Sequence, residues 1–173
     1  MEFKIRNVEW NDFEDIVKNY FSYYEEKNTD ENFGLTFQDN VPDINDEILW
    51  FSNLMIQIKR GNAIAVVAEQ SGKVIGLCDI HKKRENSELS HIGILGISII
   101  KDYRNKGIGT MMMKYAIELA RNHFDILILD VFETNNRAIH LYEKLGFIKF
   151  AYIQKGIKRN GKYIGVYSMY LQL

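Results

Sequence analysis

A short glycine-bearing segment, residues 104–110, separates two strongly patterned stretches of the sequence. It reads Arg-Asn-Lys-Gly-Ile-Gly-Thr. The preceding residues 92–100 are almost wholly apolar and rich in isoleucine, which predicts a buried strand. The residues that follow have apolar side chains at helical spacing, which predicts an amphipathic helix over 108–122. Its expected buried face comprises Ile108, Met111, Met112, Tyr115, Ala116, Leu119 and Ala120.

A glycine loop that enters a helix is suited to binding phosphate groups. The first N–H groups of a helix have no partner within the helix, and the helix dipole is positive at that end. Gly107 and Gly109 would let a ligand approach the backbone closely. The P-loop string is absent from the chain, and Met112 stands where a dinucleotide fingerprint needs its third glycine. A turn without a ligand remains an alternative reading of this loop.

A second segment, residues 129–147, reads Leu-Asp-Val-Phe-Glu-Thr-Asn-Asn-Arg-Ala-Ile-His-Leu-Tyr-Glu-Lys-Leu-Gly-Phe. With the Arg-x-x-Gly-x-Gly string of residues 104–109, it resembles the two halves of the acetyl-CoA site of the GCN5-related N-acetyltransferases, the GNAT superfamily. The two matches occur in that family's order and at its usual separation. The resemblance covers roughly residues 63–173, because the first sixty residues vary too much among such enzymes to be compared.

The order of predicted elements agrees with this resemblance. We expect one domain over residues 1–173, with strands near 3–8, 63–68, 73–80, 92–100, 126–131, 147–157 and 163–171. Helices are expected near 13–24, 43–60, 108–122 and 135–144, and the buried side of the second comprises Ile44, Ile48, Phe51, Met55 and Ile58. Residues 28–42 are polar and irregular, and residues 70–72, Gln-Ser-Gly, predict a hairpin turn. The resemblance implies an α/β (α+β) GNAT fold. Such a fold has a central, mixed and mostly antiparallel sheet, splayed parallel fourth and fifth strands, and about four flanking helices.

The resemblance also implies which residues bind acetyl-CoA. The backbone of the fourth strand would pair with the pantetheine arm, the glycine loop would receive the pyrophosphate, and Asn135 would bond the arm or cap the next helix. The expected cofactor-binding residues are Ile97, Ser98, Ile99, Arg104, Asn105, Lys106, Gly107, Ile108, Gly109, Thr110, Asn135 and Tyr142. We assign no metal site.

The implied reaction is attack by a neutral amine on the acetyl thioester. Tyr142 matches the family tyrosine that protonates the departing thiolate, and a tyrosine with an ordinary pKa of ~10 is protonated at neutral pH. Many relatives have a glutamate on the fourth strand as general base, and this chain has apolar residues there. His91 is our candidate for that role, and Glu88, Glu133 or a chain of water molecules remain alternatives.

The acceptor is expected to be the primary amine of a small molecule, an amino acid or a polyamine. The segments 90–99 and 158–169 are similar to a subgroup of the family that acts on such amines, but Gly165 stands where that subgroup usually has aspartate. The first two helices would shape the acceptor pocket, and the adjacent Tyr23 and Tyr24 should not both face inward. The alternatives are acetylation of a protein amine and non-catalytic binding of acyl-CoA. A nucleotide-binding module is the last alternative.

The composition limits which binding partners and which cellular compartment we expect for this protein. The 22 lysine and arginine residues nearly balance 23 aspartate and glutamate residues, which argues against binding to nucleic acid or an anionic membrane. No stretch is apolar enough to cross a bilayer. The single cysteine, Cys78, excludes an internal disulfide framework and suits the cytoplasm, and we expect it to be a buried thiol. The apolar side chains of the last strand would allow a homodimer.

Overall fold

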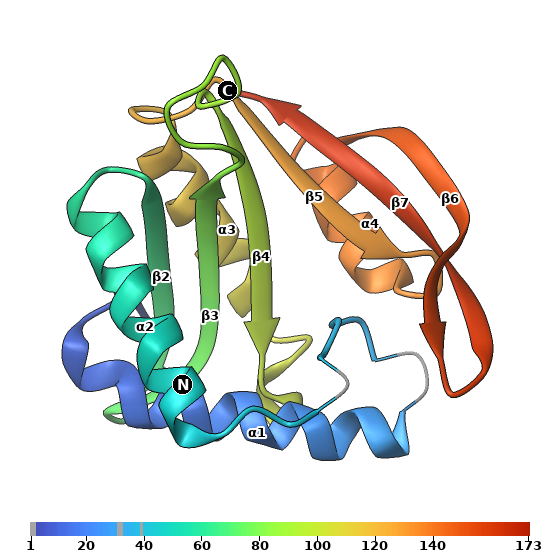
Figure 1. The fold of residues 1–173 in the computed structure, drawn as a ribbon, viewed down its shortest axis with the longest axis horizontal. Helices are drawn as coiled ribbons and strands as arrows, with labels where there is room; N and C mark the ends of the chain where they lie inside the picture. Colours follow the sequence, from blue (N-terminus) through green and yellow to red (C-terminus); the bar gives the residue numbers. More distant parts are fainter. Residues whose placement is uncertain (1–2, 31–32, 39) are drawn as a thin grey trace.

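The computed structural model describes residues 3–30, 33–38 and 40–173. Its strands form one seven-stranded sheet in the order β1-β2-β3-β4-β5-β7-β6 (Figure 1). All neighbouring strands are antiparallel except the parallel pair β4 and β5. This is the predicted mixed, mostly antiparallel sheet. The strands are β1 Lys4–Asn7, β2 Ala63–Gln70, β3 Lys73–Lys82, β4 Ile92–Ile99, β5 Ile126–Phe132, β6 Ile148–Arg159 and β7 Lys162–Gln172.

Four α-helices cover the two faces of this sheet, as predicted. They are α1 Phe13–Thr29, α2 Ile44–Lys59, α3 Ile108–Ala120 and α4 Asn136–Lys144, with short 3-10 turns η1 Trp10–Asp12 and η2 Lys101–Tyr103. Side chains of α1 and α2 pack on one face, and those of α3 and α4 share the larger core on the other face. None of the described helices is long and apolar enough to cross a membrane.

β2 shows why its sequence is apolar throughout. Val66 and Ala68 point into the core under α3, whereas Ala65 and Val67 point into the core under α2. A strand that is buried on both faces needs apolar residues at every position, so it lacks the alternation of a half-exposed strand. Cys78 on neighbouring β3 is fully buried, as expected, and burial raises the pKa of its thiol.

β4 and β5 separate along their length. They pair only from Ile92 with Ile126 to Ile94 with Ile128. Beyond that point β4 stays paired with β3 and β5 stays paired with β7, so a wedge opens between them (Figure 1). The edge of β4 that faces this wedge therefore has no strand partner along its last residues. The predicted splay is confirmed.

Two predicted helix faces differ from those observed. On α3, Met111 and Tyr115 are exposed, and Met113 and Ile117 are buried in their place. On α2, Ile44 and Ile48 are exposed and Leu54 is buried, although Phe51 is buried as predicted. In both helices the apolar arc is wider than the contact with the sheet. Spacing alone therefore does not select the buried residues. The angle at which the helix packs on the sheet decides which apolar side chains are buried.

The expectation for Tyr23 and Tyr24 was also wrong, because both side chains are buried. α1 packs against the sheet on one side and is covered on another by the segment 33–38. Tyr23 lies 5.8 Å from the ring of Phe33, and Tyr24 lies 4.5 Å from the ring of Phe37, measured between ring centroids. The sequence predicts this segment only as polar and irregular, although its aromatic side chains give α1 a second buried face.

Candidate active site

A cavity of about 600 Å³ lies in the wedge between β4 and β5. Its walls are the last residues of β4, the glycine loop, the first turns of α3 and α4, and residues 33–35 of the α1–α2 connection. The segments that the sequence predicted to bind one ligand therefore meet at one cavity. They are brought together because β4 and β5 diverge after Ile94, so the last residues of β4 and the loop that follows border the open wedge.

The N-terminus of α3 opens onto this cavity. Gly107 precedes the helix in the left-handed conformation, with φ +80°. A Cβ built on Gly107 would have no heavy atom within 4 Å, so the space beside it is open. The N–H groups of the first turn have no partner within the helix and lie at the positive end of the helix dipole. This wall of the cavity can therefore bind an anionic group such as a phosphate.

Arg104 fastens the loop to two other elements. Its Nε donates to the carbonyl oxygen of Ile99 at 2.8 Å, and its two terminal nitrogens donate to the two carboxylate oxygens of Glu26 on α1. The guanidinium also lies 5.1 Å from the ring centroid of Phe33. Much of its charge is therefore offset by Glu26, and its role in this structure is to position the loop and the end of β4.

Tyr142 reaches the cavity from α4. The residue is buried, and burial raises the pKa of its hydroxyl above the ordinary tyrosine value. Its hydroxyl has no hydrogen bond to any described residue, yet no buried polar side-chain atom among those residues lacks a partner. The hydroxyl must therefore meet the open cavity. It is a protonated donor at neutral pH, aimed into the wedge.

Asn135 caps α4 at the opposite wall. Its Oδ1 accepts from the backbone N–H of Ala138 at 3.2 Å, which satisfies one free N–H of the first turn. Gly34 crosses close above it, since a Cβ on Gly34 would lie 2.3 Å from Nδ2 of Asn135. A side chain at residue 34 would have to displace the amide of Asn135. Asn135 is therefore a helix cap and a cavity wall at once.

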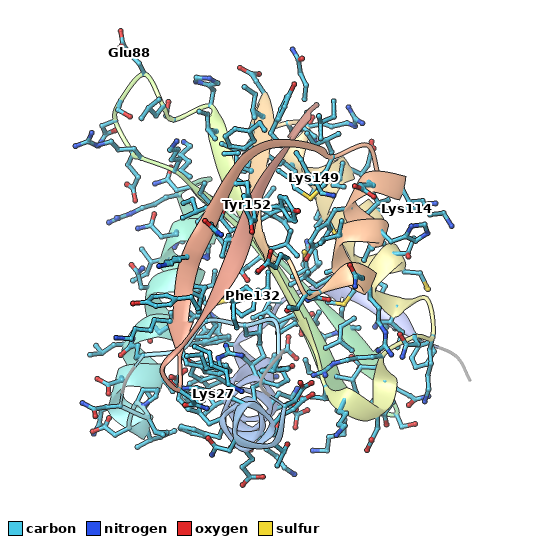
Figure 2. The ribbon with its side chains drawn as sticks, turned by 90° about the vertical axis from the view of Figure 1, so that its right-hand side faces the viewer. Lys27, Glu88, Lys114, Phe132, Lys149 and Tyr152 are labelled. Atoms are coloured by element: carbon cyan, nitrogen blue, oxygen red, sulfur yellow. The ribbon has the colours of Figure 1, made fainter. Side chains whose placement is uncertain are left out.

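The segment that carries Gly34 is held by Arg159, near the β6–β7 turn. The Arg159 guanidinium donates to the carbonyl oxygens of Phe33 and Leu35, each at 2.6 Å, and lies over the ring of Phe132. Phe132 is the last residue of β5 and pairs with Val166 of β7, and Figure 2 shows it near the centre of the view beside the β6–β7 hairpin. Sequence reasoning missed this wall of the cavity, because a buried arginine far along the chain fixes it.

The candidates for a general base do not meet at the cavity. His91 precedes β4 at the end where β4 and β5 are still paired, and its carbonyl accepts from the N–H of Asp125. Glu88 lies at the tip of the preceding loop, far from the wedge (Figure 2). Glu133 accepts from the hydroxyl of Tyr152 at 2.7 Å and the N–H of Gly165 at 2.8 Å, which lower its pKa.

The structure brings most of the predicted coenzyme-binding residues to this cavity. Two of them do not contribute their side chains. The Lys106 amine lies over the ring of Tyr103 at 5.1 Å, and Ile108 is buried in the core under α3. The predicted residues that do line the cavity are Ile97, Ser98, Ile99, Arg104, Asn105, Gly107, Gly109, Thr110, Asn135 and Tyr142. Asp130 on β5 lines it as well and was not predicted; Ser168 donates to its carboxylate at 2.6 Å.

Comparison with known proteins identifies the family. The model of the Acetyltransferase (GNAT) family matches residues 9–147, which include the glycine loop and all of α4. This chain is a member of the GNAT family. Acetyl-CoA is the cosubstrate of that family.

Among curated GNAT relatives, L-amino acid N-acetyltransferase AaaT of Escherichia coli is 32% identical over 106 residues, 60% of this chain and 65% of that protein. N-alpha-acetyltransferase 30 of Xenopus laevis is 34% identical over 100 residues, 54% of this chain and 35% of that protein. The matched part is thus less than two thirds of the length of either relative.

Solved GNAT structures share the whole fold. A GNAT-family acetyltransferase from Streptococcus pneumoniae is 30% identical, with a TM-score of 0.79 and coverage of 99% of this chain and 100% of that chain. The yncA structure from Salmonella typhimurium, solved with its cofactor acetyl-CoA, is 18% identical. Its TM-score is 0.86, and the coverage is 100% of this chain and 95% of that chain.

Proposed function

We propose that residues 1–173 form one catalytic domain that transfers an acetyl group from acetyl-CoA to a primary amine of a small molecule. The observation that carries the proposal is the shared cavity. The open N-terminus of α3 and the free hydroxyl of Tyr142 face the same wedge, next to the unpaired edge of β4. An anion-binding helix end, a strand edge and a proton donor are what a coenzyme thioester requires.

Acetyl-CoA would extend along this wedge. Its pyrophosphate would bind the N–H groups of residues 107–110, which lie where a helix end favours negative charge. Its pantetheine arm would pair with the backbone of residues 97–99, as an added strand pairs with a sheet edge. Asn135 and Tyr142 would border the thioester end. Arg104 would act through the loop it fastens, since its guanidinium is already bonded to Glu26 and Ile99.

The chemistry is direct attack in a ternary complex. The amine nitrogen forms a bond to the acetyl carbonyl carbon, the carbon–sulfur bond breaks, and the sulfur takes the proton of Tyr142. The nitrogen loses one proton, and the phenolate regains it through solvent, so the products are the amide and the free thiol. Backbone N–H groups on the β4 edge would polarise the carbonyl. We assign the base to no side chain, and His91 has no place in this scheme.

A small acceptor is supported by the relatives AaaT and MnaT, both L-amino acid acyl- or acetyltransferases of Escherichia coli. The similarity to N-alpha-acetyltransferase 30 favours a second candidate, the N-terminal amine of a protein. The two candidates differ in what must fit beside β4. The amine of a small molecule needs only a closed pocket. The N-terminal amine of a protein needs a groove that admits the polypeptide attached to it.

Thiol release from acetyl-CoA tests the proposal. The purified protein is incubated with acetyl-CoA and, one at a time, amino acids, diamines, monoamines and short peptides. Release that depends on a small amine supports the proposal, and release only with peptides replaces it by protein acetylation. Binding of acetyl-CoA without release for any acceptor refutes catalysis and leaves an acyl-CoA-binding domain.

We also propose that the enzyme is a homodimer that pairs through β6. We expected the last strand to support a dimer, but that strand, β7, is paired on both sides with β5 and β6. β6 instead is at the edge of the sheet, and its side chains Ile148, Phe150 and Ile153 are more than half exposed. An apolar, unpaired edge strand favours association with a second copy. Light scattering during gel filtration would measure the mass. A cytoplasmic location accompanies this proposal, because Cys78 is a free thiol.

A further inference from the structure

A second cavity of about 470 Å³ lies beside the coenzyme cavity, between α1, α2, β3 and β4. Leu35, Ile97 and Ser98 line both cavities, so the two adjoin at the end of β4. Tyr23 lies at this boundary, where its hydroxyl bonds the Ser98 side chain and burial raises its pKa to about 12. An acceptor in the second cavity could therefore present an amine to a thioester in the first.

The charges that line this second cavity are all negative. Asp46 and Glu47 on α2 and Asp79 on β3 contribute carboxylates. Within the described part of the chain, its lining contains no lysine, arginine or histidine. His81 lies just outside the lining, and its Nε2 is 2.8 Å from Oδ2 of Asp79, so that one carboxylate is partly neutralised.

Glu47 is the unusual member of this group. The residue is only 6% exposed, and its carboxylate has no hydrogen bond or ion pair with any residue that the structure describes. Burial and the neighbouring Asp46 raise its pKa. No fully buried side-chain oxygen among the described residues lacks a partner, so the carboxylate oxygens of Glu47 must open onto the cavity that the residue lines. A mostly buried carboxylate that faces a cavity without an ion-pair partner would be stabilised by a bound cation. The carboxylate of Glu47 therefore indicates a cationic ligand.

The remaining walls fit the aliphatic part of such a ligand. Tyr20, Tyr23 and Trp50 line the cavity together with apolar side chains of the sheet. Aromatic rings pack against methylene groups and attract ammonium groups to their faces. A ligand carboxylate would meet three acidic side chains and no basic one. The lining thus favours a ligand with several amines over an amino acid.

We propose that the acceptor is an aliphatic diamine or polyamine, whose reacting amine lies near Ile97 and Ser98 while a second ammonium group is held by Glu47. This inference rests on the proposed acetyltransferase function and narrows its substrate class. It makes Glu47 a specificity-determining residue. The L-amino acids on which the named relatives act would be poor acceptors here.

Calorimetric titration of spermidine into the protein saturated with CoA tests the binding site without turnover. Glu47→Gln should weaken spermidine binding at least about tenfold, and Glu47→Asp should retain more of it, because the charge is kept. Glu118→Gln, on the exposed side of α3, is the control and should bind spermidine normally. Equal affinity in wild type and Glu47→Gln would overturn the assignment. Because Glu47→Gln removes a mostly buried charge that lies beside Asp46 and has no ion pair among the described residues, its melting temperature should not fall.

Kinetics supply the second test. The kcat/KM of the wild type for putrescine should exceed those for n-butylamine and L-leucine by about tenfold or more, and Glu47→Gln should remove this preference by raising KM for putrescine. A wild type that prefers L-leucine overturns the proposal and leaves the acetyltransferase function intact. Spermidine binding that depends on Glu47, without transfer to any amine, refutes the acetyltransferase function and keeps the cation site.

Discussion

The carboxylate of Glu133 fills the space in which a side chain of residue 165 would stand. Its Oε1 accepts from the backbone N–H of Gly165 at 2.8 Å, and a Cβ on Gly165 would lie 2.7 Å from its carboxylate carbon. The hydroxyl of Tyr152 donates to the other oxygen and would lie 2.5 Å from that Cβ. An acidic group thus comes from the residue that follows β5, at the point where the resemblance led us to expect an aspartate on β7.

Gly165→Asp should therefore destabilise the protein, although aspartate is the residue expected from the resemblance. The new side chain would collide with Glu133 and Tyr152 and would bring two negative charges together. Such overpacking costs about 1–3 kcal/mol of unfolding free energy. Urea unfolding followed by circular dichroism would measure the loss.

The double variant Gly165→Asp, Glu133→Ala is the decisive comparison for this pair. Removal of the Glu133 carboxylate opens the space that the introduced aspartate side chain needs, so the double variant should be more stable than Gly165→Asp alone. If the loss of unfolding free energy in the double variant equals the sum of the losses in the two single variants, the two side chains do not compete for one space.

The same carboxylate should make stability depend on acid pH. Hydrogen bonds from Tyr152 and Gly165 lower the pKa of Glu133 in the folded state. Its stabilising contribution is therefore complete above its unfolded pKa of ~4.3 and is lost as pH falls through the folded pKa. Melting temperatures of wild type and Glu133→Gln should differ most near neutral pH and converge below about pH 4. A difference in melting temperature that stays the same at every pH would show that the charge of Glu133 is not the source of the stabilisation.

Gly107→Ala should separate backbone strain from ligand binding. A left-handed conformation costs an L-residue roughly 1–2 kcal/mol, and the added methyl group would occupy the open space at the α3 N-terminus. We expect acetyl-CoA affinity to fall about tenfold or more, as measured by calorimetry.

Gly72 is the matched control for this change. It lies in the β2–β3 turn with φ +75°, and its Cβ would likewise have no heavy atom within 4 Å. Gly72→Ala should lower the melting temperature by a similar amount and leave acetyl-CoA affinity unchanged. An equal loss of affinity in both variants would exclude a specific role for Gly107.

Tyr142→Phe should lower kcat by about 100-fold or more and leave the affinity for acetyl-CoA nearly unchanged. The change removes the proton donor and keeps the ring that packs beside Phe147. Tyr115→Phe on the exposed side of α3 is a control that should retain full activity. An unaltered kcat in Tyr142→Phe would remove this residue from the mechanism.

The pH profile gives an independent test of Tyr142. Burial raises its pKa above the ordinary value of ~10, so the hydroxyl should stay protonated throughout the neutral and mildly alkaline range. The kcat of the wild type should therefore not decline below about pH 10 through loss of this proton. A fall of kcat near pH 8 that is absent in Tyr142→Phe would contradict the assignment.

Glu26→Gln should show that Arg104 acts by holding the loop. Loss of the charge partner leaves the partly buried guanidinium of Arg104 with a weaker contact to α1, at a cost of about 1–3 kcal/mol. Acetyl-CoA affinity should fall together with stability, although residue 26 is absent from the cavity lining. Unfolding and calorimetric titration of the same preparation would measure both.

Local patterns were sufficient for most of the fold. The continuous apolar run of β4, the turn at Ser71-Gly72 and the glycines before α3 each constrain only neighbouring residues, and each was predicted within a few residues of its observed bounds. The buried faces of α2 and α3 were predicted less well. Their apolar arcs are wider than the surfaces they bury, and the choice between Met111 and Met113 depends on how the helix packs on the sheet.

The candidate site divides in the same way. By itself, the sequence determined the glycine loop and the strand that precedes it, because spacing along the chain encodes them, and the resemblance to the GNAT family indicated Tyr142. Only the tertiary structure decided that Glu133 is held by Gly165 and Tyr152, that Arg159 holds residues 33–35 over the wedge, and that Glu47 is buried without a partner among the described residues. Those relations join residues far apart in the chain, and the burial and charge around each exist only once the sheet and its helices have packed.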